Sequence, residues 1–276
     1  SFLIMFCFSK NIKLKNIISV YILFSTLTLL FSKIGKAQIE RVKPKKIILL
    51  IGQSNMSGRA PMIKGDMEVV ENAFLFDSLN QWIPLKSPLN IHSSIRKNAR
   101  MQRFNLGYSF AEEITRSKTI IPLGMVVNAR GGTRISQWTP DTHYYKEAVR
   151  RCKLAMGEDG LAVATFWLQG EGNLNDDDEN FKAYFQKLKS IIYSLREDLN
   201  NKKMIFLAAE LNKNKSENEI FKKMLAQLDN KVENAGSVKS FGTSTYDGTH
   251  YDNKSLRVLG VRFAEKLKNL LKKTNL

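Results

Sequence analysis

Cysteine and histidine are scarce in this chain of 276 residues. The cysteines are Cys7 and Cys152, and we expect Cys7 to leave with an N-terminal leader. One remaining cysteine excludes a disulfide framework and a cysteine metal site. Cys152 lies in a helical pattern, which favours a buried small apolar residue over a reactive thiol. A histidine base must be His92, His143 or His250.

Long apolar runs are absent after the first 37 residues. The run at residues 17–31 follows several lysines and precedes a segment ending in Ala37, which predicts a secretory signal peptide over residues 1–37. A retained membrane anchor is the alternative, but the run is shorter than the ~20 residues that a spanning helix needs. We therefore expect a secreted or periplasmic protein, residues 38–276, that has no membrane contact after cleavage.

The excess of positive charge is large, with a formal net charge of +17. The lysines are spread along many predicted helices, with small clusters only at residues 43–46 and near 272–273, and no aromatic residues interleave with these clusters. This pattern is typical of a solvated basic surface that attracts acidic polymers, rather than of a nucleic-acid site. We therefore expect no nucleic-acid partner.

Apolar runs and helical patterns alternate along the chain. The apolar runs, typical of buried parallel strands, cover residues 47–51, 121–127, 161–168, 204–209 and, weakly, 238–243. The helical patterns cover residues 107–116, 144–156, 176–199, 217–232 and 253–272. This alternation predicts an α/β sandwich with a parallel sheet, formed by one domain from residue 38 to the end.

Two further segments have their own patterns. Residues 68–88 contain two short β-type runs, 73–76 and 82–85, and are expected to form a hairpin that decorates the domain. The acidic run at residues 176–179 could suggest a metal site. It falls on the first turn of a predicted helix, where carboxylates complement the helix dipole, so a helix start is the better interpretation.

Three polar loops follow predicted strands, at the sheet edge where open α/β folds bind ligands. The first contains Ser54, whose hydroxyl could stand above the sheet edge as a nucleophile or could simply cap a helix. The second and third could supply glycine N–H groups and a glutamine amide for an oxyanion. The loops cover residues 52–58, 128–133 and 169–173.

A serine nucleophile needs a base, and His250 is the best placed of the three histidines. His92 lies in a polar segment and His143 opens a helix, so we expect surface or capping roles for both. His250 follows the last predicted strand, and Gly248 allows a turn that brings Asp247 to the imidazole. The alternative is an Asp-Gly turn with no catalytic role.

Together, four motifs resemble the sialate O-acetylesterase and acetyl xylan esterase branch of the SGNH hydrolases. The resemblance implies a three-layer α/β/α, flavodoxin-like fold and metal-independent removal of acetyl groups from sugars, with no cofactor. The motifs are GQSNMSG at residues 52–58, GGT at 131–133 with Ile135 and Trp138, QGE at 169–171, and DGTH at 247–250.

The resemblance also implies the roles of individual residues. Ser54 is the nucleophile, His250 the base and Asp247 its partner, while Glu171 can also serve the histidine. The oxyanion hole is implied to comprise the Ser54 N–H, the Gly131 and Gly132 turn and the Gln169 side chain. The chain departs from the family pattern at Arg134, Gly172 and Asn173. We expect these departures to affect the wall of the pocket more than the catalytic residues.

Two other functions remain possible from the residues alone. Another SGNH esterase of short acyl esters or lipids would need a long apolar acyl channel, which the sequence does not indicate. A non-catalytic carbohydrate-binding protein on the same fold would be expected to lose the serine or the histidine, and both are present. The acetylated glycan, of sialic acid, xylan or another type, is left open.

Overall fold

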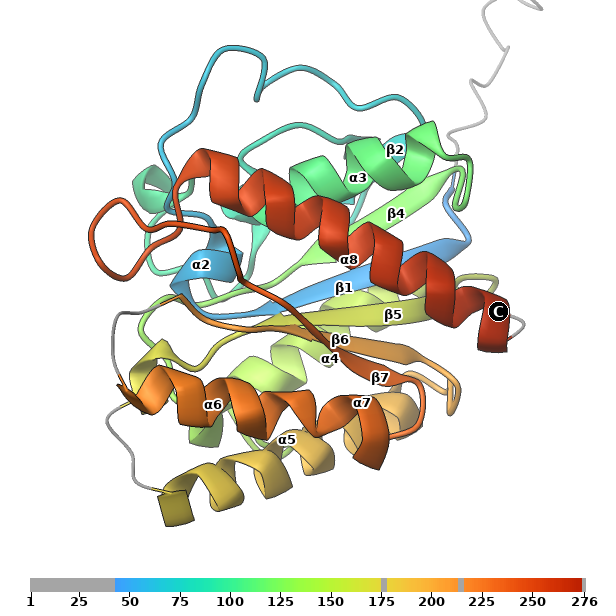
Figure 1. Cartoon of the computed structure of the whole chain (residues 1–276). Helices are drawn as coiled ribbons and strands as arrows, with labels where there is room; N and C mark the ends of the chain where they lie inside the picture. Colours follow the sequence, from blue (N-terminus) through green and yellow to red (C-terminus); the bar gives the residue numbers. More distant parts are fainter. Residues whose placement is uncertain (1–42, 175–177, 213–215, 275–276) are drawn as a thin grey trace, which may run out of the picture. The chain divides into compact units, whose positions relative to one another are not determined.

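The computed structural model describes residues 43–174, 178–212 and 216–274 (Figure 1). The predicted signal peptide and residues 176–177 of the acidic run lie outside these ranges, so the leader stays a prediction. The described part of the acidic run, residues 178–179, lies at the start of the helix Asp178–Asp198. The described residues from 43 to 274 belong to one compact unit. Within the described ranges, none of the helices combines the length and apolar character that crossing a membrane requires.

Seven strands of the described residues form one sheet in the order β3-β2-β4-β1-β5-β6-β7. Every neighbouring pair is parallel except β2 and β3, which confirms the predicted parallel α/β sheet. The strands are β1 (Lys46–Gly52), β2 (Ala73–Phe76), β3 (Trp82–Pro84), β4 (Leu123–Val127), β5 (Leu161–Leu168), β6 (Ile205–Ala209) and β7 (Ala235–Val238).

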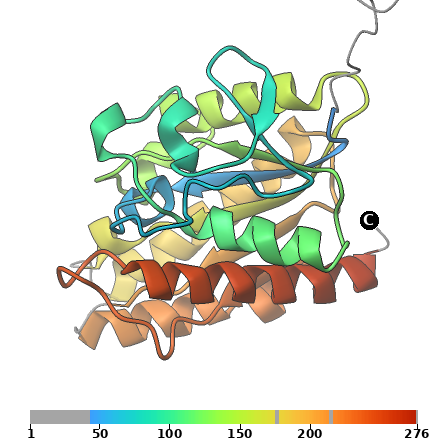
Figure 2. The same cartoon turned by 90° about the horizontal axis from the view of Figure 1, so that it is seen from above.

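Helices cover both faces of this sheet, which gives the expected three layers. Helices α3 and α8 lie side by side on one face, and α4 lies on the other (Figure 2). The helices are α2 (Ser54–Ser57), α3 (Leu106–Arg116), α4 (His143–Met156), α5 (Asp178–Asp198), α6 (Ser216–Ala226), α7 (Leu228–Lys231) and α8 (Asn253–Thr274). Short 3₁₀ turns include η1 (Leu89–His92) and η4 (Glu171–Asn173).

Continuous apolar strands and periodic apolar helices explain this layering. Residues 47–51 of β1 are fully buried, as a strand covered on both faces should be. On α8, Leu256, Leu259, Phe263 and Leu267 are buried at helical spacing, and the Phe263 ring lies 4.6 Å from that of Phe166 on β5. Burial of these faces places the core between the sheet and its helices.

Three element predictions need correction. The last strand is not 238–243 but Ala235–Val238, because Ser240 already turns away to bond Glu210 and Leu211. The helix expected at 217–232 is divided into α6 and α7. The hairpin forms as expected, but its strand β2 also pairs in parallel with β4, so it extends the sheet rather than only decorating it.

The topology singles out the end of β1 for a ligand site. Strand β1 lies between β4 and β5, so the chain builds one half of the sheet from β1 and then crosses to build the other. In such sheets ligands bind in the crevice outside the carboxyl ends of the strands at this switch point. Helix α2, which begins with Ser54, follows β1 directly at this place (Figure 1).

Candidate active site

A serine, a histidine and an aspartate form a continuous chain of contacts at the switch point. The His250 Nε2 lies 3.0 Å from the Ser54 Oγ, and the His250 Nδ1 lies 2.6 Å from the Asp247 Oδ2. Ser54 begins α2, whereas His250 lies on the loop between β7 and α8. The fold therefore joins the predicted nucleophile and base, which are far apart in the sequence, in the order that an activated serine requires.

The turn around Gly248 holds Asp247 against the imidazole. The Asp247 Oδ1 accepts hydrogen bonds from the backbone N–H groups of Thr249 (2.9 Å) and His250 (2.7 Å). Burial raises the pKa of Asp247, but the hydrogen bonds from the His250 side chain and from both backbone groups outweigh it and lower that pKa. An ionised carboxylate only accepts hydrogen bonds, so it places the imidazole proton on Nδ1 and leaves Nε2 basic.

The second candidate carboxylate, Glu171, acts on a different group. It accepts a hydrogen bond from the Asn55 Nδ2, which also donates to the Thr249 carbonyl oxygen at 3.1 Å. The Asn55 Oδ1 accepts from the Tyr251 backbone N–H at 3.0 Å. Asn55 thus holds the residues on both sides of His250, and Glu171 orients Asn55. This geometry favours the helper role for Glu171.

The Gln169 side chain does not agree with its expected role in the oxyanion hole. It is fully buried, and its Nε2 lies near the oxygens of Thr133 (2.9 Å), Asn173 (3.0 Å) and Gln53 (3.1 Å). Its Oε1 accepts from the Tyr184 hydroxyl at 2.8 Å. An amide nitrogen has only two hydrogens, so these internal acceptors leave none for a substrate. Gln169 instead joins the three loops.

Backbone donors remain beside the serine. Among the described residues, no acceptor contacts the backbone N–H of Ser54, Gly131 or Gly132. A Cβ at Gly131 would lie 3.5 Å from the Ser54 Cβ, so the glycine turn lies directly against the nucleophile. The structure thus brings the expected turn to the serine with N–H groups to donate.

The departures from the family pattern contact one another. The Arg134 Nη1 donates to the Gly172 carbonyl oxygen at 2.7 Å. A Cβ at Gly172 would lie 2.8 Å from the Thr133 carbonyl oxygen, so only glycine fits this approach. The Asn173 Oδ1 accepts from the Ile135 backbone N–H at 3.1 Å. These residues therefore cross-link the second and third loops.

Several residues at the site were missed by the sequence reasoning. Gln53 and Asn55 belong to the first motif, but their sequence positions do not reveal their partners. The Tyr246 ring stacks on that of His250, with ring centres 6.0 Å apart, and its hydroxyl donates to the Arg59 carbonyl oxygen at 3.2 Å. Tyr246 directly precedes the last motif, and Arg59 directly follows the first, so adjacency was the available signal.

Other candidate groups do not join the site. His143 is the first residue of α4, and His92 lies half-buried in η1, where burial lowers its pKa. Cys152 is buried as expected, and burial raises the pKa of its thiol to about 12. Within the described ranges no group of three or more His, Cys, Asp or Glu residues has the arrangement of a metal site. Metal independence stays a prediction.

A comparison with protein families identifies the chain at the family level. The sequence model of the family described as "carbohydrate esterase, sialic acid-specific acetylesterase" matches residues 44–269. The chain belongs to this carbohydrate esterase family. The expected resemblance is thereby confirmed over nearly all of the described residues.

Similar proteins and solved structures support the family and the fold. A probable carbohydrate esterase from Arabidopsis thaliana is 27% identical over 175 residues, which cover 58% of this chain and 66%, just under two thirds, of that protein. A solved Arabidopsis thaliana structure has a TM-score of 0.73 at 22% identity, covering 82% of this chain and 98% of that one. A carbohydrate acetylesterase from Xanthomonas citri has a TM-score of 0.59 at 17% identity, with coverages of 82% and 57%.

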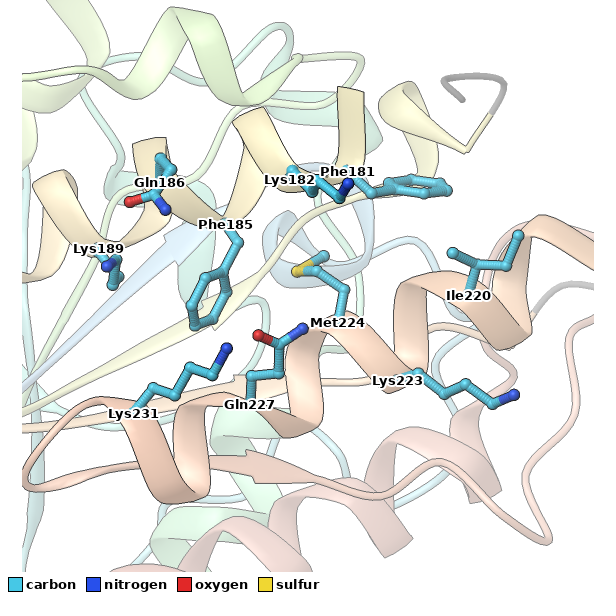
Figure 3. A pocket seen from close by; sticks show the side chains of 10 residues that line it. All are labelled: Phe181, Lys182, Phe185, Gln186, Lys189, Ile220, Lys223, Met224, Gln227 and Lys231. Carbon is cyan, nitrogen blue, oxygen red and sulfur yellow. The ribbon is translucent and has the colours of Figure 1, made fainter. Parts of the chain in front are cut away.

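The protein also has a cavity that none of the predicted site residues lines. It has a volume of about 620 Å³ and lies between α5 and the α6–α7 segment (Figure 3). Helix α5 contributes Lys182 and Lys189, and the facing segment contributes Lys223 and Lys231. The cavity belongs to the basic surface rather than to the sheet edge that carries Ser54 and His250.

Proposed function

We propose that this protein is a secreted or periplasmic serine esterase that removes O-acetyl groups from carbohydrates. The contact chain from Ser54 through His250 to Asp247 carries this proposal. The donors beside Ser54 and the membership in a carbohydrate esterase family support it. The leader pattern at residues 1–37 supports export.

The first half of the reaction transfers the acetyl group to the enzyme. Ser54 Oγ attacks the acetyl carbonyl carbon while His250 Nε2 takes the hydroxyl proton. The N–H groups of Ser54 and Gly131 donate to the oxygen that becomes negative. The bond between the acetyl carbonyl carbon and the sugar oxygen then breaks, and His250 donates the proton that it took from Ser54 to the sugar oxygen. The products are acetyl-Ser54 and a free sugar hydroxyl.

The second half releases acetate. A water molecule attacks the acetyl-Ser54 carbonyl carbon while His250 Nε2 takes one of its protons. Collapse of the intermediate breaks the bond to Ser54 Oγ, which recovers the proton from His250. Asp247 stays ionised throughout, because its pKa is lowered, and it stabilises the transient imidazolium. Glu171 supports this cycle through Asn55 rather than by moving protons.

The proposed substrate is an acetylated glycan of the sialic acid or xylan type. The positive net charge that the chain keeps after loss of the lysine-containing leader would raise the local concentration of an acidic glycan and speed its encounter with the enzyme. Fit to the sugar is decided by contacts at the site and not by this long-range field. We expect no nucleic-acid partner and no cofactor.

The proposal is tested by acetate release from a panel of acetylated sialosides and xylans, with Ser54→Ala as the matched control. We expect the unmodified enzyme to release acetate from at least one of these glycans, and to hydrolyse p-nitrophenyl acetate much faster than the butyrate. Hydrolysis of neither ester would favour a binding protein. A preference for the butyrate would favour an esterase of longer acyl groups.

A further inference from the structure

A positively charged side chain lies beside the proposed nucleophile without an acidic partner. Arg59 follows the α2 turn that begins with Ser54, and it is only 9% exposed. Among the described residues no carboxylate forms an ion pair with it. Burial lowers the pKa of the Arg59 guanidinium, so the fold holds a charge where water solvates it poorly.

One branch of the guanidinium is fixed and the other is available. The Nη1 donates to the carbonyl oxygens of Gly58 (3.1 Å) and Met101 (2.6 Å), which sets the plane of the group. The Nη2 lies 2.8 Å from the position of the Cβ that Gly131 lacks. That same position is 3.5 Å from the Ser54 Cβ. Arg59 and Ser54 therefore border one small space, which any side chain at residue 131 would fill.

The proposed oxyanion hole lacks the side-chain donor that the sequence predicted. The Gln169 amide is used by three internal oxygens, which leaves the backbone N–H groups. The Arg59 Nη2 has no acceptor among the described residues. A charged donor forms a stronger hydrogen bond with an oxyanion than a neutral amide does. The Arg59 Nη2, which has neither an acidic partner nor another acceptor among the described residues, thus lies beside the Gly131 turn, where the oxyanion hole has only backbone donors.

We infer that Arg59 is a further catalytic residue, whose Nη2 donates to the acetyl oxygen as that oxygen becomes negative. The inference rests on the proposed serine mechanism. The developing charge supplies the anion that the resting site lacks, so the interaction is stronger in the transition state than with the neutral ester. The glycine at residue 131 keeps the space between Nη2 and the serine open.

The test must separate this role from a structural one, because Arg59 also ties Gly58 to Met101. We would measure kcat and KM with p-nitrophenyl acetate for the unmodified enzyme, Arg59→Ala and Arg103→Ala. Arg103 is a neighbouring exposed arginine whose charge acts on Arg59, so it controls for the general field. For Arg59→Ala we expect kcat to fall about 10²-fold, with KM changing little. Arg103→Ala should stay near the unmodified enzyme.

Chemical rescue gives a readout that a structural role would not move. Millimolar guanidinium should restore part of the kcat of Arg59→Ala, whereas urea, similar in shape but uncharged, should not. The unmodified enzyme in the same solutions corrects for solvent effects. If Arg59→Ala does not fold, Arg59→Met keeps the apolar stem, and the same loss of kcat is expected.

Three outcomes would overturn the inference: undiminished kcat in a folded Arg59 variant, an equal loss in Arg103→Ala, or equal effects of guanidinium and urea on Arg59→Ala. Failure of the serine mechanism is seen separately, since Ser54→Ala would then retain turnover. An active enzyme that needs Ser54 but not Arg59 refutes only the role of Arg59.

Discussion

Two loops at the same edge of the sheet are built in opposite ways. The loop that carries the base is open to solvent, with side-chain exposures of 39% for Asp247 and 23% for His250. The loop that follows β5 is closed: Gln169 and Asn173 are buried and hydrogen-bonded to neighbouring loops. Groups that exchange protons with a substrate need access, whereas groups that fix the geometry need rigid partners. We therefore expect the loop that carries His250 to take part in proton transfer, and the loop that follows β5 to hold the site in shape.

Asn55 connects these two loops. Its side chain binds Glu171 of the closed loop and the backbone of Thr249 and Tyr251 in the open loop. Asn55 also directly follows Ser54 in the chain. Its side-chain amide therefore fixes the position of the open loop relative to the nucleophile. Mutations in the two loops should therefore have different effects. Those in the open loop should lower turnover, and those in the closed loop should lower the stability of the fold.

The largest effect is expected from removing the reacting groups themselves. Ser54→Ala and His250→Ala should each lower kcat by at least ~10³-fold, because both act in one acyl-transfer unit. Circular dichroism should show an intact fold, since neither side chain supports the core. Steady-state hydrolysis of p-nitrophenyl acetate measures this. Near-normal turnover of His250→Ala would break the assignment of chemistry to the open loop, and near-normal turnover of Ser54→Ala would break the assignment of the nucleophile.

The two carboxylates test the comparison most sharply. Asp247→Asn should lower kcat by ~10³-fold or more, because an amide no longer fixes the Nδ1 proton. Glu171→Gln should cost less, since the contact of its carboxylate with Asn55 reaches His250 indirectly. Turnover of both single variants and the double variant is the measurement. The reverse ranking would transfer the triad acid to the closed loop.

Asn55→Ala should have an intermediate effect, about 10²-fold on kcat, because small displacements of a catalytic group are costly. A matched control is Asn201→Ala, which removes a buried amide bound to the Ala162 carbonyl oxygen at the other end of β5. The control should lose stability without losing kcat in the folded enzyme. Equal kcat values for the two variants would show that Asn55 does not position His250.

The smallest effect on turnover is expected at Gln169. Gln169→Ala should destabilise the fold by about 1–3 kcal/mol, because it leaves buried partners unsatisfied. Denaturant unfolding measures this loss, and kcat should fall less than in Asn55→Ala. Unchanged stability with a kcat reduced by about 10²-fold would return the Gln169 amide to the oxyanion hole.

Much of this arrangement could be predicted from the sequence, and the exceptions have physical causes. The strands with continuous apolar residues were located well, and the four motifs identified the residues that meet at the sheet edge. Strand β7 was misplaced because Ala235, Gly236 and Ser237 carry no apolar β-branched side chain. Its identity depends on pairing with β6, which periodicity does not reveal.

The roles of Gln169 and Arg59 could not be predicted for a different reason. Each role depends on which hydrogen-bond donors and acceptors of the side chain are already bonded to other residues of the protein. Gln169 is engaged by Tyr184, which lies on α5, and by Gln53 of the first loop. Arg59 is notable for the acidic partner that it lacks among the described residues. A motif specifies residue types in order, but hydrogen-bond partners become visible only when the loops are assembled.

The central claim is that Ser54 carries the acetyl group during turnover. Rapid acid quench of the enzyme with p-nitrophenyl acetate, followed by peptide mass spectrometry, tests it most directly. We predict one added acetyl group on Ser54, more abundant in Asp247→Asn if deacylation is slowed more than acylation, and none on that peptide in Ser54→Ala. Continued hydrolysis with Ser54 unmodified, or with the acetyl group on another residue, would contradict the account.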